Sequence, residues 1–278
     1  MSFFRSRKLA PVTSDFLLEC KDLVRHYGKI KPVDGVSLNL RPHELLSILG
    51  PSGCGKSTTG KALLQLPHPT SGSVQLDGEE LTQLSRTEMT ARRTDIQMIF
   101  QDPYSSLNPR MLVKDIVQES LDINSTLTEN EKIEKVHWLL DKVGLSAEQS
   151  NRYPHEFSGG QRQRIGIARA LATEPEIVIA DEPVSALDVS IQAQIINLMM
   201  DLQNEFDLSI IFIAHDLSVV KHISDRVGVM NLGELVEINE TGQIFSDPQH
   251  DYTKELLRAI PEPDPFGREE RKRKRLNI

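Results

Sequence analysis

The sequence contains little cysteine, few aromatic residues and no long apolar run. Cys20 and Cys54 are its two cysteines, and Cys54 lies inside a glycine-rich stretch that a disulfide would obstruct. We therefore expect two free thiols in a reducing compartment. No stretch approaches the roughly 18 apolar residues of a membrane span, and residues 1–11 lack the apolar core of a signal peptide. A role at a membrane would need another chain that crosses it.

A basic net charge is also absent. The formal net charge is −8, which argues against broad non-specific binding of nucleic acid. The basic run at 271–275 is read first as a solvated tail, and contact with anionic lipid is the lesser hypothesis. With 38% hydrophobic and 26% charged residues, the 278-residue chain can bury a core, and its length allows about two units.

A phosphate-binding motif stands near the start of the chain. The stretch 50–58 fits G-x-x-x-x-G-K-[ST] and lies between an apolar run at 45–49 and a helix-compatible segment at 56–66. Its glycines allow successive backbone N–H groups to curl around an anion at a helix start. We expect Lys56 to contact the β- and γ-phosphates and Ser57 to place a hydroxyl on Mg²⁺. The stretch consists of Gly50, Pro51, Ser52, Gly53, Cys54, Gly55, Lys56, Ser57 and Thr58.

Hydrophobic patterning predicts two kinds of sheet. Alternating apolar and polar residues at 17–20 and 36–40 are typical of antiparallel strands with one wet face. Continuous apolar runs at 177–180 and 210–214, separated by a helical pattern, instead indicate a parallel sheet covered on both faces.

The segment 104–175 is helical in character. Thr128 and Glu131 have capping-box spacing, apolar residues follow at helical intervals, and Gly144 is a plausible stop. We therefore expect an α/β fold of the P-loop NTPase class, with a RecA-like parallel core sheet, an antiparallel β subdomain and an inserted helical subdomain. Residues 227–237 suggest a hairpin, and the proline- and charge-rich tail from Pro261 suggests a mobile end.

Polar residues follow three of the predicted strands. Asp181 and Glu182 come directly after the run 177–180, and ligands bind at the carboxyl ends of parallel strands. Asp181 suits the Mg²⁺ shell, and Glu182 suits a general base at the γ-phosphate. His215 follows the next strand and is placed to hold Glu182 or the γ-phosphate, while Gln101 follows an apolar segment at 96–100.

A second anion cradle is predicted at 158–161. Ser-Gly-Gly-Gln precedes a long helical stretch and offers free N–H groups, close backbone approach and a hydroxyl. One nucleotide does not need two cradles on one chain, so we infer that this cradle serves the nucleotide of another subunit.

Each motif also has an ordinary structural interpretation. The glycine-rich stretch could be a plain turn, the acids at 181–182 a strand-to-loop turn, His215 and Gln101 solvated loop residues, and Ser158 a simple helix cap. The combination favours the functional interpretation, although the spacing at 158–161 alone would not.

Together these segments resemble the ATP-binding cassette (ABC) ATPase family over roughly 16–237. The stretches 50–58, 158–161 and 177–181 are similar to its Walker A, signature and Walker B motifs, and 185–188 to its D-loop. The resemblance implies catalytic roles for Lys56, Gln101, Glu182 and His215. It implies Mg²⁺ ligation by Ser57, Gln101 and Asp181. Beyond the loop, it implies ATP contacts from Tyr27 and Asp188 and, in trans, from Ser158, Gly160 and Gln161.

A narrower resemblance is to the oligopeptide/dipeptide/nickel importer ATPases. It rests on the segments 101–110, 152–157, 184–194 and 250–261. Phe157 and Val184 depart from the wider family, where leucine and threonine are usual, and they look like subfamily features. Asp251 departs from an expected proline. Some relatives carry a C-terminal iron–sulfur cluster, but no cysteine follows Cys54, so none is expected here.

The resemblance implies the ATPase subunit of an importer for peptides or a related small solute, with ATP and Mg²⁺ as cofactors. The expected partners are two transmembrane permease subunits, a second cassette arranged head to tail, and indirectly an extracytoplasmic solute-binding protein. A heterodimer of cassettes is favoured over a homodimer. The expected location is peripheral, on the cytoplasmic face of a prokaryotic inner membrane, with 238–278 as a C-terminal extension.

Two other classes of protein stay open at this stage. A soluble ABC ATPase of translation or DNA repair usually carries tandem cassettes or a long coiled-coil insertion, and the sequence shows neither. A P-loop kinase or GTPase-type switch would not need the cradle at 158–161. The transported solute is not encoded in the motifs.

Overall fold

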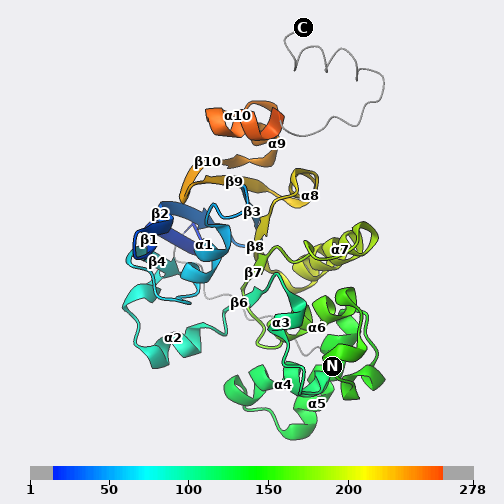
Figure 1. The fold of residues 1–278 in the computed structure, drawn as a ribbon. Coiled ribbons are helices and arrows are strands. Elements are labelled where there is room, and N and C mark those ends of the chain that lie inside the picture. The colour runs from blue at the N-terminus through cyan, green and yellow to red at the C-terminus, as the bar shows by residue number, and fades with distance from the viewer. Residues whose placement is uncertain (1–14, 259–278) are drawn as a thin grey trace, which may run out of the picture.

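The computed structural model describes residues 15–258, which form two sheets and a group of helices (Figure 1). The strands are β1 (Leu18–Tyr27), β2 (Ile30–Leu40), β3 (Leu45–Leu49), β4 (Ser71–Leu76), β5 (Glu79–Glu80), β6 (Ile96–Ile99), β7 (Ile177–Asp181), β8 (Ser209–Ala214), β9 (Arg226–Asn231) and β10 (Glu234–Glu240). The helices are α1 (Lys56–Leu63), α2 (Arg86–Arg92), α3 (Pro103–Ser106), α4 (Val113–Asn124), α5 (Glu129–Lys142), α6 (Gly159–Leu171), α7 (Val189–Phe206), α8 (Leu217–Ile223), α9 (Thr241–Ser246) and α10 (Asp251–Arg258). Short 3₁₀ turns occupy Leu81–Gln83, Ala147–Asn151 and Pro154–Glu156.

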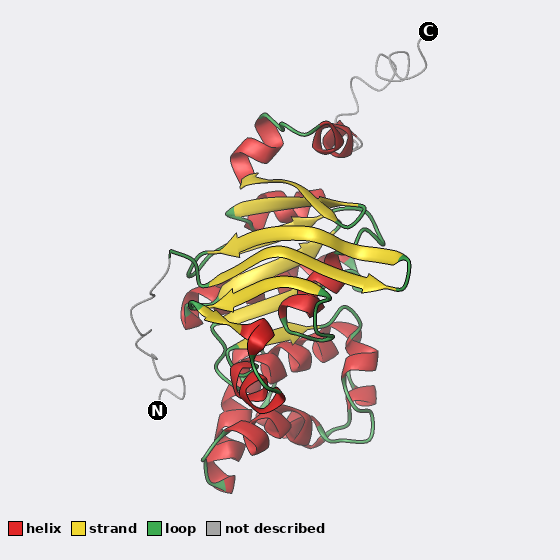
Figure 2. Ribbon diagram, turned by 90° about the vertical axis from the view of Figure 1, so that its left-hand side faces the viewer, coloured by secondary structure: helices red, strands yellow, loops and turns green. Residues whose placement is uncertain are grey.

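The core sheet has the order β10-β9-β3-β8-β7-β6. Strands β9, β3, β8, β7 and β6 pair in parallel, and β10 pairs antiparallel with β9. Both β7 and β8 are buried along their whole length, which agrees with their continuous apolar sequence. Figure 2 shows the strands crossing the middle of the molecule. The predicted parallel sheet is confirmed, and it brings the carboxyl ends of β3, β7 and β8 to one edge.

Successive residues of one core strand face different hydrophobic clusters. On β8, Ile211 and Ile213 belong to a cluster with α1 and the antiparallel sheet, whereas Ile210 and Phe212 belong to a cluster with α5, α6 and α7. This follows from the alternation of side chains along a strand. The core sheet is therefore covered on both faces, by a different hydrophobic cluster on each.

The second sheet has the order β2-β1-β4-β5 and is antiparallel. It forms the predicted antiparallel β subdomain, and α1 packs against β1 and β2. Helix α1 ends at Leu63 instead of at 66, because Gln65 takes a positive φ of 56° and Leu64 caps the helix.

The helical subdomain lies below the core sheet in Figures 1 and 2 and contains α3, α4, α5 and α6. The predicted capping box is present, since Thr128 and Glu131 bond each other's backbone N–H groups. Gly144 follows α5 with a φ of +74°, as expected for the predicted stop.

The C-terminal part of the described chain packs back onto the core sheet. The carboxylate of Glu237 on β10 accepts hydrogen bonds from the backbone N–H groups of Gln249 (2.8 Å) and His250 (3.0 Å), just before α10. The predicted mobile tail and the basic run at 271–275 lie outside residues 15–258. Within that range no helix has the length and apolar character needed to cross a bilayer. Cys20 and Cys54 are both free and buried.

Candidate functional site

The predicted phosphate loop connects β3 to α1. Gly55, the residue before the helix, has a φ of +111°, and a Cβ built there would lie 1.8 Å from the carbonyl oxygen of Pro32. A side chain at this position is excluded on both grounds, so the glycine is required by the fold as well as by the anion. The loop therefore presents its backbone at the start of α1 (Figure 1), the position at which helix N–H groups bind phosphate.

Lys56 lies across this loop. Its Nζ donates to the carbonyl oxygens of Gly50 (2.9 Å) and Pro51 (3.0 Å), and Lys56 is only 4% exposed. The two carbonyls hold the ammonium group at the mouth of the loop without neutralising it, which leaves its charge for a phosphate.

Ser57 and Asp181 meet at the edge of the core sheet. The Ser57 hydroxyl donates to Asp181 Oδ1 at 2.6 Å, although the two residues are 124 positions apart. Burial raises the pKa of Asp181, and the Ser57 hydrogen bond opposes this only in part. A hydroxyl and a carboxylate are hard oxygen donors of the kind that Mg²⁺ prefers, so this pair fits the ion that the sequence implies.

Glu182 lies at the centre of three converging side chains. Gln101 Nε2 donates to Glu182 Oε2 at 3.0 Å, His215 Nδ1 lies 3.3 Å from the same oxygen, and Lys56 Nζ lies 3.8 Å from Oε1. The carboxylate side chain is 12% exposed, and the residue takes a positive φ of 45°. Non-glycine residues adopt this region at a cost, and such residues cluster at functional sites.

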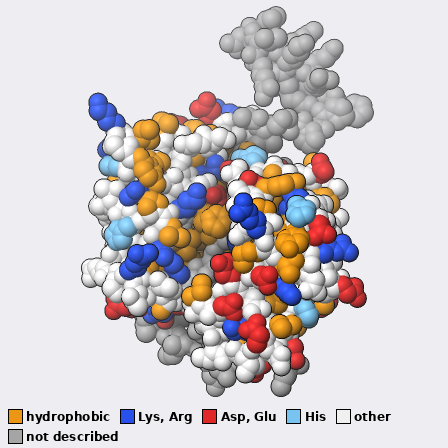
Figure 3. All heavy atoms as spheres, turned by 60° about the horizontal axis from the view of Figure 1, so that its bottom comes forward, with side chains coloured by type: hydrophobic (Ala, Val, Ile, Leu, Met, Phe, Trp, Pro, Cys, Tyr) orange, Lys and Arg blue, Asp and Glu red, His pale blue; other side chains and the backbone are white. Residues whose placement is uncertain are grey.

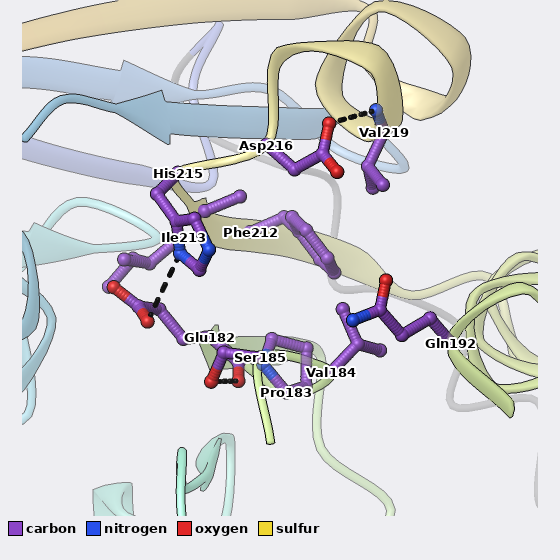
Figure 4. Close-up of a pocket in the computed structure, with 11 residues that line it drawn as sticks. Glu182, Pro183, Val184, Ser185, Gln192, Phe212, Ile213, His215, Asp216 and Val219 are labelled. Atoms are coloured by element: carbon purple, nitrogen blue, oxygen red, sulfur yellow. Dashed lines mark hydrogen bonds and ion pairs between the residues drawn. The ribbon is translucent and has the colours of Figure 1, made fainter. Parts of the chain in front are cut away.

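A hollow opens beside Glu182 (Figure 4). Figure 4 shows His215 above Glu182, joined by a dashed line, with Phe212 and Val184 on the far side of the hollow. This hollow could not be predicted from the sequence, because its lining comes from three segments that the fold brings together: 182–185, Gln192 of α7, and 212–216 with Val219.

The second cradle begins α6. The Ser158 hydroxyl accepts from Gln161 N at 3.3 Å, and Gln161 Oε1 accepts from Ser158 N at 3.0 Å. A Cβ on Gly160 would lie 2.5 Å from Ile191 Cγ2, so the cradle packs tightly against the start of α7. Ser158 thus caps its own helix, and within residues 15–258 its side chain is not hydrogen-bonded to the phosphate loop. In Figure 1 the helical subdomain that contains α6 lies away from α1, the helix that follows the loop.

The two remaining predicted contacts are exposed residues at the ends of their elements. Tyr27 ends β1, is 48% exposed, and has the Arg25 guanidinium 4.5 Å from its ring centroid. Asp188 precedes α7 as its N-cap residue, without a side-chain hydrogen bond to that helix, and is exposed.

The segment after Gln101 is fastened to the cradle helix. The Arg162 guanidinium packs 3.6 Å from the centroid of the Tyr104 ring, and its Nε donates to the carbonyl oxygen of Pro154 at 2.7 Å. Arg169 Nη1 donates to the carbonyl oxygen of Ser106, so α3 and α6 are joined at two points. Sequence reasoning missed both arginines, because neither lies in a position that a motif marks for this contact.

Known proteins resemble this chain in sequence. The profile of the ABC transporter family matches residues 33–185, and that of the oligopeptide/dipeptide transporter C-terminal region matches residues 236–277. The oligopeptide transport ATP-binding protein OppF of Bacillus subtilis is 55% identical over 255 residues, which cover 90% of this chain and 84% of that protein. The oligopeptide transport ATP-binding protein AppF of the same bacterium is 49% identical over 265 residues, which cover 91% and 80%.

Solved structures resemble it in fold. The ATP-binding cassette MJ0796, in a dimeric post-hydrolysis state bound to ADP and Pi, has a TM-score of 0.73 at 30% identity, with 81% of this chain and 98% of that chain covered. The protein cbiO1 from Clostridium perfringens, part of the ABC transporter complex cbiONQ, has a TM-score of 0.76 at 28% identity, with 89% and 97% covered.

Proposed function

The chain belongs to the ABC transporter family as an ATP-hydrolysing subunit of the peptide-importer type, and on this premise we propose how its residues act and with what they assemble. The observation that carries the proposal is the convergence of Lys56, Gln101 and His215 on Glu182, next to the Ser57–Asp181 pair. The alternative of a non-transport ABC ATPase is not favoured.

Binding of ATP begins at the loop 50–58. Its N–H groups and the ammonium group of Lys56 take the phosphates, while Tyr27 stacks on adenine through its exposed ring. Ser57 and Asp181, with Gln101 nearby, would hold Mg²⁺, which supplies positive charge against the phosphate oxygens when it is bound.

Hydrolysis depends on Glu182. Its carboxylate polarises the attacking water, and Gln101 and His215 hold the carboxylate in place through the contacts at 3.0 and 3.3 Å. Lys56 stabilises the charge that develops on the γ-phosphate. No covalent intermediate with the protein is required.

A second cassette completes the site. Since Ser158, Gly160 and Gln161 lie apart from the phosphate loop of their own chain, we place them on the γ-phosphate held by the partner, with Asp188 at the same interface. We propose that the partner is a different cassette, so that the pair is a heterodimer.

Two permease subunits are the proposed membrane partners to which ATP binding and hydrolysis are coupled. Tyr104 is 67% exposed beside Gln101 and is packed on Arg162 of the cradle helix. Seen from the end that carries the helical subdomain, hydrophobic side chains lie exposed among both basic and acidic side chains (Figure 3). We propose that the permease docks here, which holds the chain at the cytoplasmic face of the inner membrane, and that an extracytoplasmic binding protein delivers the peptide.

The test is co-purification. The full chain, carrying an affinity tag, is isolated from detergent-solubilised membranes, and the bound proteins are identified by mass spectrometry. We expect two permease subunits and one cassette of different sequence, and a Tyr104→Asp variant should recover fewer permease subunits than a Tyr153→Asp control. Recovery of ribosomes or DNA repair proteins would contradict the importer assignment, and recovery of this cassette alone with permease would contradict the heterodimer.

A further inference from the structure

The ring of Tyr27 packs against a cation that no motif indicated. The guanidinium carbon of Arg25 lies 4.5 Å from the ring centroid, within the roughly 6 Å over which a cation is attracted to a π-face. Arg25 is half-buried, whereas Tyr27 is 48% exposed. One face of the ring is thus occupied from within the chain, and much of the residue remains accessible.

Besides its contact with the ring, Arg25 is held by a hydrogen bond to the backbone. Its Nη1 donates to the carbonyl oxygen of His68 at 2.8 Å, and its Nε is buried without a hydrogen-bond partner in the described part of the chain. The neighbouring residue His26 is tied to the same connecting segment, since its N–H donates to Thr70 Oγ1 at 3.0 Å. The guanidinium therefore lies over the ring while its Nη1 is held by a backbone carbonyl.

His68, whose carbonyl oxygen holds Arg25, lies in the segment that follows the C-terminal end of the phosphate-loop helix. Helix α1 starts at the loop and has 8 residues, a length of about 12 Å at 1.5 Å per residue. The segment 64–70 follows its other end, and α1 packs on β1 and β2. Arg25 is thus held by the segment after the end of α1 that is remote from the phosphate loop, and Tyr27, which is 48% exposed, keeps surface available for a base.

We propose that Arg25 is a positioning residue for nucleotide binding. It fixes the plane of the Tyr27 ring, and its charge strengthens the stacking of a purine on the other face. This inference rests on the proposed role of Tyr27 as the adenine contact. Because Arg25 acts through the ring, it favours a ligand with a base and is indifferent to a bare polyphosphate.

The test compares two probes by isothermal titration calorimetry on the full chain with Mg²⁺: ATP, and inorganic tripolyphosphate, which has no base. Arg25→Met should weaken ATP binding about two- to fivefold, the range of an exposed cation–π contact, and leave tripolyphosphate binding unchanged. Arg25→Lys, which keeps the charge without the flat guanidinium, should lose less. The matched control is Arg41→Met, since Arg41 pairs at 3.2 Å with Glu240 and lies outside the site; it should change neither affinity.

The outcomes separate the proposals. Equal weakening of both probes by Arg25→Met would show a long-range charge effect and overturn the role of Arg25. Unchanged ATP affinity in Arg25→Met, with weaker ATP binding in Tyr27→Ala, would overturn it too. If Tyr27→Ala has no effect, the base contact itself is wrong, and Arg25 with it. Loss of both probes in Lys56→Ala would still support the phosphate site, which tests the proposed function separately.

Discussion

Replacing Glu182 by glutamine should separate ATP binding from ATP hydrolysis. The substitution keeps the size of the side chain and an oxygen that can accept from Gln101 or His215, but it removes the base. General-base assistance is worth about 10²- to 10⁴-fold in rate, or about 3–5 kcal/mol in the barrier at ~1.36 kcal/mol per tenfold. We expect turnover to fall by at least two orders of magnitude.

The affinity for ATP should not fall together with the turnover. The Glu182 carboxylate lies 3.8 Å from Lys56 Nζ, and two unit charges at about 4 Å interact by about 4 kcal/mol at an effective dielectric constant of ~20. Part of this attraction competes with the phosphates for Lys56. Its removal should leave ATP binding unchanged or strengthen it by up to about tenfold, which is ~1.4 kcal/mol.

The assay is phosphate release at saturating ATP and Mg²⁺ on the assembled cassette pair, with ATP-driven association followed by light scattering. The exposed Glu234→Gln substitution is the control for loss of one negative charge and should behave as wild type. Near-normal hydrolysis by Glu182→Gln would refute the assignment of the base. A loss of ATP binding as large as the loss of turnover would show that Glu182 holds the loop together instead.

Two further predictions concern buried or bonded carboxylates. Asp181→Asn should raise the melting temperature of the nucleotide-free chain near neutral pH, because burial raises the pKa of Asp181 and its ionised form opposes folding. The difference in melting temperature between variant and wild type should shrink as the pH falls through that raised pKa, because protonation of Asp181 then stabilises the wild type. The control is Asp188→Asn at an exposed position, for which thermal melts should show no such change. Glu237→Gln should weaken the attachment of α10. Burial raises the pKa of the Glu237 carboxyl, but the hydrogen bonds from the N–H groups of Gln249 and His250 outweigh burial, so the pKa is lowered overall. The ionised Glu237 carboxylate should stabilise the wild type over the variant by about 1–3 kcal/mol. This stabilisation should be present above the pKa that Glu237 has in the unfolded chain, and it should be lost as the pH falls through the lowered pKa of the folded chain. Hydrogen exchange of residues 247–258 measures it, and equal exchange in both proteins would contradict it.

The sequence predicted the core sheet well because local pattern and burial agree there. The run 177–180 has no polar residue to face solvent, so as a strand it must be covered on both sides, and β7 is buried throughout. The prediction failed in detail where one residue decides the backbone: nothing in the pattern at 56–66 shows that Gln65 takes a positive φ and ends α1 early.

The sequence also predicted which residues would lie near the phosphate loop. Since Asp181, Glu182 and His215 each follow an apolar strand, parallel pairing alone placed them near the loop at 50–58. The Tyr104–Arg162 contact could not be predicted from the sequence, because an arginine can reach many neighbours and this one depends on how α3 packs on α6. Arg25 and Tyr27 lie two positions apart on β1, so only the anchoring of Arg25 on the carbonyl oxygen of His68 needed the fold.

The sequence by itself thus determined which groups are candidates for the chemistry: a glycine-rich loop before a helix, two carboxylates at the end of a buried strand, and a Ser-Gly-Gly-Gln helix start, each defined by residues close together along the chain. Only the tertiary structure decided how these parts meet. Ser57 reaches Asp181 across 124 positions, and Gln101 reaches Glu182 across 81, because the order β3-β8-β7-β6 brings their strand ends to one edge. The same packing holds Ser158 as the cap of its own helix, and our proposal is that another chain brings its matching cradle to the site.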